Sequence, residues 1–218
     1  MNSTPLAATR TAQPEYPSAF TRLVDVVVDP REAFQRVSDR SPWALAFVVV
    51  IALRFVSLLV FYHPELTIPK LIAGVLFQVG TVAPMLLAVA TVMWLAAKAW
   101  DVRLTWQSSF SVTTHVVVAH TLATIALASV AGVVLADSAD IDLRNPPFSN
   151  IAYFVTNESD LLGRLLAELD IRSAYGVWLM WLGVRAAAPT DSRTGTAMVI
   201  ATCAVARLLL ALAAPGSV

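Results

Sequence analysis

The chain has 218 residues, of which 57% are hydrophobic and only 14% are charged, and its formal net charge is zero. Soluble domains carry about 25% charged residues, so this composition excludes a surface that lies mostly in water. The zero net charge argues against nucleic acid as a partner, and the single cysteine, Cys203, excludes an internal disulfide and a cysteine-based zinc site.

The first 41 residues contain no stretch long enough to cross a membrane. Residues 1–18 are rich in Ser, Thr, Pro and Ala, which predicts a disordered cytoplasmic tail. Residues 19–41 predict a cytoplasmic amphipathic segment, in which Asp29-Pro30-Arg31-Glu32 has the capping-box pattern of a helix N-terminus. The helix that follows lies either on the inner membrane surface or beneath the helix bundle. Its candidate membrane-surface or partner-binding residues are Arg31, Phe34, Arg36 and Val37.

Five apolar stretches follow, each comparable with the roughly 20 residues that a spanning helix needs. Gly80 and Pro84 predict a bend in the second stretch, because proline removes a helix hydrogen bond. The sequence therefore predicts an all-α integral membrane protein, a five-transmembrane-helix bundle with an N-terminal amphipathic interfacial helix. The predicted spans are about 43–62, 68–97, 112–135, 174–188 and 196–214, within a membrane domain of residues 42–215.

The distribution of Lys and Arg in the short flanks predicts the orientation of the chain. With a cytoplasmic N-terminus, the inner side holds Arg10, Arg22, Arg31, Arg36, Arg40, Lys98, Arg103, Arg185 and Arg193. The outer side then holds only Lys70, Arg144, Arg164 and Arg172. Because cytoplasmic loops carry an excess of basic residues, we expect a cytoplasmic N-terminus and an external C-terminus.

Two segments carry a family resemblance. Leu23-Val24-Asp25-Val26-Val27-Val28-Asp29-Pro30-Arg31-Glu32-Ala33-Phe34, followed by Ser41-Pro42-Trp43, resembles the opening of bacterial members of the Yip domain family (Ypt-interacting-protein-like). Glu168-Leu169-Asp170-Ile171-Arg172-Ser173-Ala174-Tyr175, before an aromatic span with Gly183, is similar to the segment preceding the fourth helix of that family.

The resemblance implies five transmembrane helices, a cytoplasmic N-terminus and, for the bacterial branch, the inner (cytoplasmic) membrane. Eukaryotic relatives bind Rab-type GTPases and carry a longer N-terminal region with a Gly-Pro-containing acidic motif. This chain has only about forty residues before its first span. Binding of a Rab-type GTPase is therefore not carried over to it.

Arg54 and Arg207 each lie in the middle of a predicted span, roughly 16 Å from its inner start, and no span contains an acidic residue. An arginine at the bilayer centre costs about 2.5–3.5 kcal/mol on insertion scales. Two interpretations remain open. The arginines hold helices together through backbone carbonyls, or they form an anion- or lipid-binding site together with His120 and Gln78.

Signatures of catalysis are absent from the sequence, which has no Gly-rich phosphate loop, no His-Glu-x-x-His motif and no paired intramembrane acids. His115 and His120 are five residues apart and do not share a helix face, so neither a metal site nor another cofactor is expected. We predict a non-enzymatic multi-pass membrane protein that organises membrane or recruits partners through its N-terminal segment. The alternative is a small transporter or lipid-handling protein with a midplane anion site. Expected partners are membrane lipids and a second copy or another membrane protein.

Overall fold

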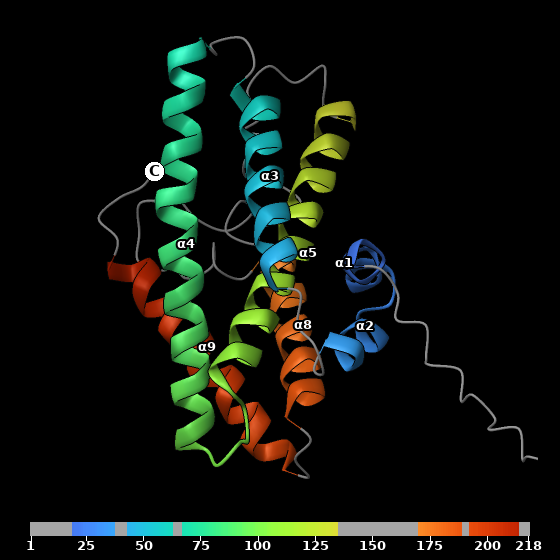
Figure 1. Ribbon diagram of the computed structural model, residues 1–218, viewed down its shortest axis with the longest axis vertical. Coiled ribbons are helices and arrows are strands. Elements are labelled where there is room, and N and C mark those ends of the chain that lie inside the picture. Colours follow the sequence, from blue (N-terminus) through green and yellow to red (C-terminus); the bar gives the residue numbers. More distant parts are fainter. Residues whose placement is uncertain (1–18, 38–42, 63–66, 135–169, 189–191, 214–218) are drawn as a thin grey trace, which may run out of the picture.

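The computed structural model describes residues 19–37, 43–62, 67–134, 170–188 and 192–213, which form an all-helical fold (Figure 1). Its helices are α1 (Ala19–Val28), α2 (Pro30–Val37), α3 (Trp43–Tyr62), α4 (Ile68–Ala99), α5 (Trp106–Val134), α8 (Ile171–Ala187) and α9 (Arg193–Ala213). The predicted all-α fold class is confirmed. The tail predicted at residues 1–18 lies outside the described residues.

α5 is the central helix of the bundle, because it contacts α3, α4 and α8 as well as α1 and α2. Residues 109–116 of this helix are all buried, although five of these eight are polar. Two of their hydroxyl groups donate to the carbonyl four residues earlier, which helps them to stay inside. Ser109 donates to the Thr105 carbonyl at 3.1 Å, and Thr114 donates to the Phe110 carbonyl at 2.7 Å. Such back-bonding satisfies a buried hydroxyl within its own helix.

Two glycines of α8 allow this helix to pack closely against α5. A Cβ atom placed on Gly183 would lie 2.5 Å from a methyl group of Val112 and 3.2 Å from the ring of Phe34. One placed on Gly176 would lie 3.7 Å from the imidazole of His120. Later α8 residues therefore contact earlier α5 residues, and the two helices run antiparallel. Small residues of this kind let helix backbones approach in membrane proteins.

α3 and α4 cover another side of α5, and the three helices stand side by side in Figure 1. The Trp43 ring lies 5.3 Å from the Phe110 ring in an edge-on arrangement, which places the first residues of α3 beside the first turns of α5. α4 continues as one helix from Ile68 to Ala99 and passes through Gly80 and Pro84 without interruption. The exposed ring of Pro84 lies on the outer surface of the helix.

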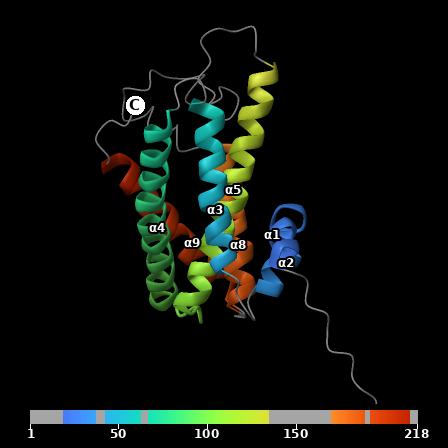
Figure 2. The ribbon, with the colours of Figure 1, turned by 45° about the horizontal axis from the view of Figure 1, so that its top comes forward.

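The N-terminal helices lie beside one end of this bundle. In Figure 1 α1 is seen end-on while α3, α4 and α5 stand upright, and both views place α1 and α2 at the side of the bundle (Figures 1 and 2). α1 therefore runs across the bundle axis. The predicted cap between the two helices is confirmed, since the backbone N–H of Glu32 donates to Asp29 Oδ1 at 3.2 Å. The backbone N–H of Asp29 donates to the Asp25 carbonyl at 2.7 Å, which joins the cap to α1.

Caps also explain where two other helices begin relative to the predicted apolar stretches. α5 begins at Trp106, ahead of the stretch predicted from residue 112, because Thr105 Oγ1 accepts the backbone N–H of Ser108 at 3.1 Å. α8 begins at Ile171, ahead of residue 174, because Asp170 accepts the backbone N–H of Arg172. An N-terminal side-chain acceptor of this kind satisfies an otherwise unpaired helix donor.

Two helices among the described residues are long and apolar enough to cross a membrane, Ile68–Ala99 and Trp106–Leu127. Trp43–Val56 is a shorter apolar helix by the same test. α8 has 17 residues, and at 1.5 Å per residue it extends about 26 Å. By length and composition, two of the described helices could therefore cross a membrane, and the shorter helices pack beside them.

Candidate functional site

The half-buried imidazole of His120, on α5, is influenced by charged side chains from other segments of the bundle. The charges within electrostatic range of its imidazole come from four residues on three other segments: Arg54, Asp170, Arg172 and Arg207. Two of the residues predicted for an anion site, Arg54 and Arg207, are thus within electrostatic range of a third, His120. The fourth, Gln78, is half-buried on α4.

Asp170 was not predicted from the sequence as one of the residues near His120. Its side chain is 7% exposed, and its carboxylate forms an ion pair with the guanidinium of Arg172, which is 14% exposed. It also accepts the backbone N–H of Arg172 at 2.7 Å and so caps α8. Asp170 lies just ahead of the fourth span predicted from residue 174, and its partner is Arg172 rather than one of the two central arginines. Asp170 immediately precedes a short helix, and that helix packs on α5 and carries the carboxylate into the bundle.

The two predicted arginines differ in their surroundings. Arg54 is half-buried on α3, and its Nε is enclosed without a hydrogen-bond partner among the residues that the structure describes. Arg207 is exposed on the surface of α9. Arg54 is consequently the more enclosed of the two cations and the stronger candidate for a buried anion contact, since a donor without a partner inside a protein is costly.

Phe34 lies inside the protein. Its side chain is 1% exposed, and its ring stands edge-on to the buried ring of His115 with 6.5 Å between the two centroids. Ala33 beside it is also fully buried. This face of α2 therefore packs on α5 and α8. Such packing corresponds to the second of the two alternatives given for the amphipathic helix, in which the helix lies beneath the bundle rather than on the membrane surface. Arg31 is exposed on the same helix, and the side chains of Arg36 and Val37 lie outside the described residues.

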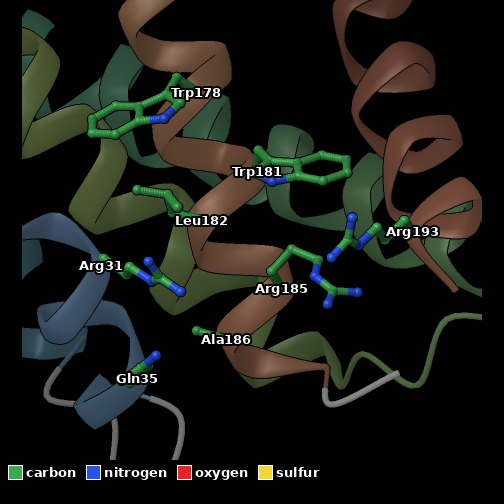
Figure 3. A pocket seen from close by; sticks show the side chains of 8 residues that line it. All are labelled: Arg31, Gln35, Trp178, Trp181, Leu182, Arg185, Ala186 and Arg193. Atoms are coloured by element: carbon green, nitrogen blue, oxygen red, sulfur yellow. The ribbon is translucent and has the colours of Figure 1, made fainter. Parts of the chain in front are cut away.

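A second site lies where α2, α8 and the start of α9 meet. These elements enclose a groove of about 670 Å³ (Figure 3). Its lining residues are Arg31, Gln35, Trp178, Trp181, Leu182, Arg185, Ala186 and Arg193. Figure 3 shows the side chains of Arg185 and Arg193 next to each other, with Arg31 reaching toward α8 from α2. Sequence reasoning assigned these arginines to separate cytoplasmic flanks and did not predict that they meet.

The spacing within α8 explains how the groove combines two kinds of surface. Trp178, Trp181, Leu182 and Arg185 follow the i, i+3, i+4, i+7 pattern, which places them along one face of the helix. This pattern was the signal in the sequence that could have indicated the groove. The face changes from aromatic and aliphatic to cationic toward the C-terminal end of α8. An arrangement of this kind suits a ligand with an apolar part and an anionic part.

The helical fold, the long apolar helices and the buried glycine contacts define the chain as a helical membrane protein. A family model described as the Yip1 domain matches residues 24–214. The chain therefore belongs to the Yip1 domain family, and the family resemblance seen in the sequence is confirmed. No curated protein and no solved structure matches the chain.

Proposed function

We propose that this Yip1 domain protein is a non-enzymatic multi-pass protein of the bacterial inner membrane, with its N-terminus in the cytoplasm and its C-terminus outside. It crosses the membrane five times, through α3, α4, α5, α8 and α9. Its N-terminal helices, α1 and α2, organise the membrane or recruit partners at the cytoplasmic surface. The family assignment supports a membrane protein, and the arrangement of α1 supports the role given to the N-terminal segment.

The observation that carries this proposal is the uncovered apolar face of α1. Val24, Val27 and Val28 are 45%, 43% and 77% exposed, and their i, i+3, i+4 spacing places them together. Val26 of the same helix is fully buried, so α1 is fixed to the bundle on one side. A helix that runs across the bundle axis with an exposed apolar face is suited to lie in the membrane interface.

The residues at the same end of the bundle support a cytoplasmic location for α1 and α2. This end contains the C-termini of α4 and α8 and the N-termini of α3, α5 and α9. The basic residues described there are Arg31, Lys98, Arg103, Arg185 and Arg193, whereas the remainder of the helices contributes Lys70, Arg172 and the two central arginines. Tryptophans also lie at this end. Lys98 Nζ lies over the ring of Trp94, 4.0 Å from its centroid. Basic side chains are typical of the cytoplasmic side, and tryptophans are typical of either membrane–water interface.

The test places an environment-sensitive bimane label at Val24→Cys in a Cys203→Ser background, which leaves one cysteine in the reconstituted protein. We expect brominated lipids to quench this label, because the α1 face inserts into the leaflet. Val28→Asp should reduce the quenching, whereas Gln107→Asp, which adds the same charge at an exposed position off α1, should not. A label that brominated lipids leave unquenched, or one that Val28→Asp leaves unchanged, contradicts the proposal.

A second candidate function rests on the enclosed Nε of Arg54 near His120. In this alternative the protein is a small transporter or lipid-handling protein, and Arg54, Arg207, His120 and Gln78 hold an anion inside the bundle. Reconstituted wild-type protein should then transfer anions or lipids, and Arg54→Met with Arg207→Met should abolish the transfer while the helices remain folded. Absence of transfer in wild type rejects this function.

A further inference from the structure

The groove between α2, α8 and α9 has a cationic part and an aromatic part. Arg185 lies in the last turn of α8, and Arg193 is the first residue of α9. Trp178, which is 48% exposed, lies about two helical turns from Arg185 on the same face of α8. Arg31 faces them from α2 across the groove (Figure 3). The groove therefore combines three guanidinium groups with an indole-lined wall.

The charged residues among the described lining of the groove are Arg31, Arg185 and Arg193, and Arg31 and Arg193 are exposed. Arg193 adds its charge to the positive end of the α9 dipole, and Ser192 caps that end by accepting the backbone N–H of Gly195 at 2.9 Å. Guanidinium groups bind phosphate oxygens through paired, charge-assisted hydrogen bonds.

We infer that this groove binds the phosphate headgroup of an anionic phospholipid, with the arginines on the phosphate and Trp178, Trp181 and Leu182 against the glycerol and the first acyl carbons. The inference deepens the proposed function, and it rests on that function only in placing this end of the bundle at a membrane leaflet. The apolar face of α1 lies nearby on the same end, so lipid captured in the groove stays next to the helix that enters the leaflet. The groove thereby selects lipid by headgroup charge.

Phosphate is favoured over other anions by the number and the type of the donors. The guanidinium groups of Arg31 and Arg193 present paired N–H donors, which match the several oxygens of a phosphate better than the two oxygens of a carboxylate. The adjoining tryptophans distinguish a lipid phosphate from free phosphate, because indole rings prefer the boundary between headgroups and acyl chains. Both sources share the same phosphate chemistry, and the experiment therefore includes both.

The experiment measures lipid binding to the delipidated full-length protein in detergent by native mass spectrometry. Phosphatidylglycerol is compared with phosphatidylcholine, and inorganic phosphate is added as a competitor. The variants are Arg31→Gln, Arg193→Gln and the two combined. The control is Arg103→Gln, an exposed arginine at the same end of the bundle that does not line the groove. Circular dichroism verifies that each variant is folded, and Arg193→Lys serves as a conservative version if a glutamine variant is not.

We expect phosphatidylglycerol to bind more tightly than phosphatidylcholine. Each glutamine substitution should weaken the binding of phosphatidylglycerol about fivefold, since one basic residue near anionic lipid contributes about 1 kcal/mol of binding free energy. Arg103→Gln should leave the affinity unchanged, and inorganic phosphate should displace the lipid poorly. Equal affinities in the variants and wild type, or an equal loss in Arg103→Gln, would overturn the inference. Full displacement by millimolar inorganic phosphate would overturn the assignment to lipid. The quenching experiment on α1 involves none of these arginines. The proposed function and the lipid-binding groove can therefore each be rejected without the other.

Discussion

Two groups of arginines in this protein differ in what surrounds them. Inside the bundle, Arg172 is paired with the buried carboxylate of Asp170, and His120 lies within range of both. At the end of the bundle, Arg31, Arg185 and Arg193 line an open groove that has no carboxylate among its described lining residues. The difference teaches that the pair of Asp170 and Arg172 belongs to the fold, whereas exposed arginines such as Arg31 and Arg193 can be reached by a ligand.

Removal of Asp170 should have the largest effect on stability. Asp170→Ala removes both the ion pair and the helix cap, and it leaves Arg172 enclosed without its partner. Loss of one member of a buried pair costs about 3–5 kcal/mol, and loss of a cap costs about 1 kcal/mol more. Unfolding of the detergent-solubilised protein by denaturant measures this free energy. Asp170→Asn should lose less, because an amide oxygen can keep the cap. Equal losses in the two variants would show that the cap contributes nothing, and an Asp170→Asn variant as stable as the wild type would show that the charge is irrelevant.

Phe34→Ala should lower both the stability and the lipid affinity, because it loosens α2, the helix that contains Arg31. The ring of Phe34 is fully enclosed among α2, α5 and α8, and its removal leaves a cavity that costs about 3–5 kcal/mol. The variant should also bind phosphatidylglycerol more weakly, since α2 no longer holds Arg31 at the groove. Native mass spectrometry and denaturant unfolding measure the two effects on one sample. A variant with full lipid affinity would show that the position of α2 does not matter to the groove.

Gly183→Ala should cost less but act at the same junction. The added methyl group would lie 2.5 Å from Val112, so α8 must move away from α5. Overpacking of this kind costs about 1–3 kcal/mol. The midpoint of thermal unfolding measures it, with Gly80→Ala as the matched control, because a Cβ atom on Gly80 meets nothing within 4 Å. Equal midpoints for the two variants would contradict the close packing of α5 and α8.

Substitution of the groove arginines should have the smallest effect on stability. Arg31→Gln and Arg193→Gln change exposed side chains, and the unfolding free energy should change by no more than about 0.5 kcal/mol. Their effect should appear in lipid binding alone. A loss of stability comparable with that of Asp170→Asn would mean that these arginines support the fold, and the contrast between the two regions would then disappear.

The sequence allowed the helices and the cap at Asp29 to be predicted, because these depend on local patterns of apolar residues, proline and polar acceptors. The family was also recognisable from two short segments. Asp170 was expected only in the segment before the fourth span, and its burial could not be predicted because it depends on how the short helix α8 packs against α5. The groove could not be predicted from one segment either, because Arg31, Arg185 and Arg193 belong to three helices that only the tertiary fold brings together.

A photo-crosslinking experiment tests the central claim about the groove most directly. Phosphatidylglycerol with a diazirine near its headgroup is incorporated into proteoliposomes, irradiated, and located on the protein by peptide mass spectrometry. We predict that the modified residues concentrate on the α8 face between Trp178 and Arg185, and that Arg31→Gln combined with Arg193→Gln removes this labelling. Labelling spread evenly over the exposed lipid-facing residues of α4, such as Leu76 and Phe77, with no effect of the two substitutions, would contradict the account.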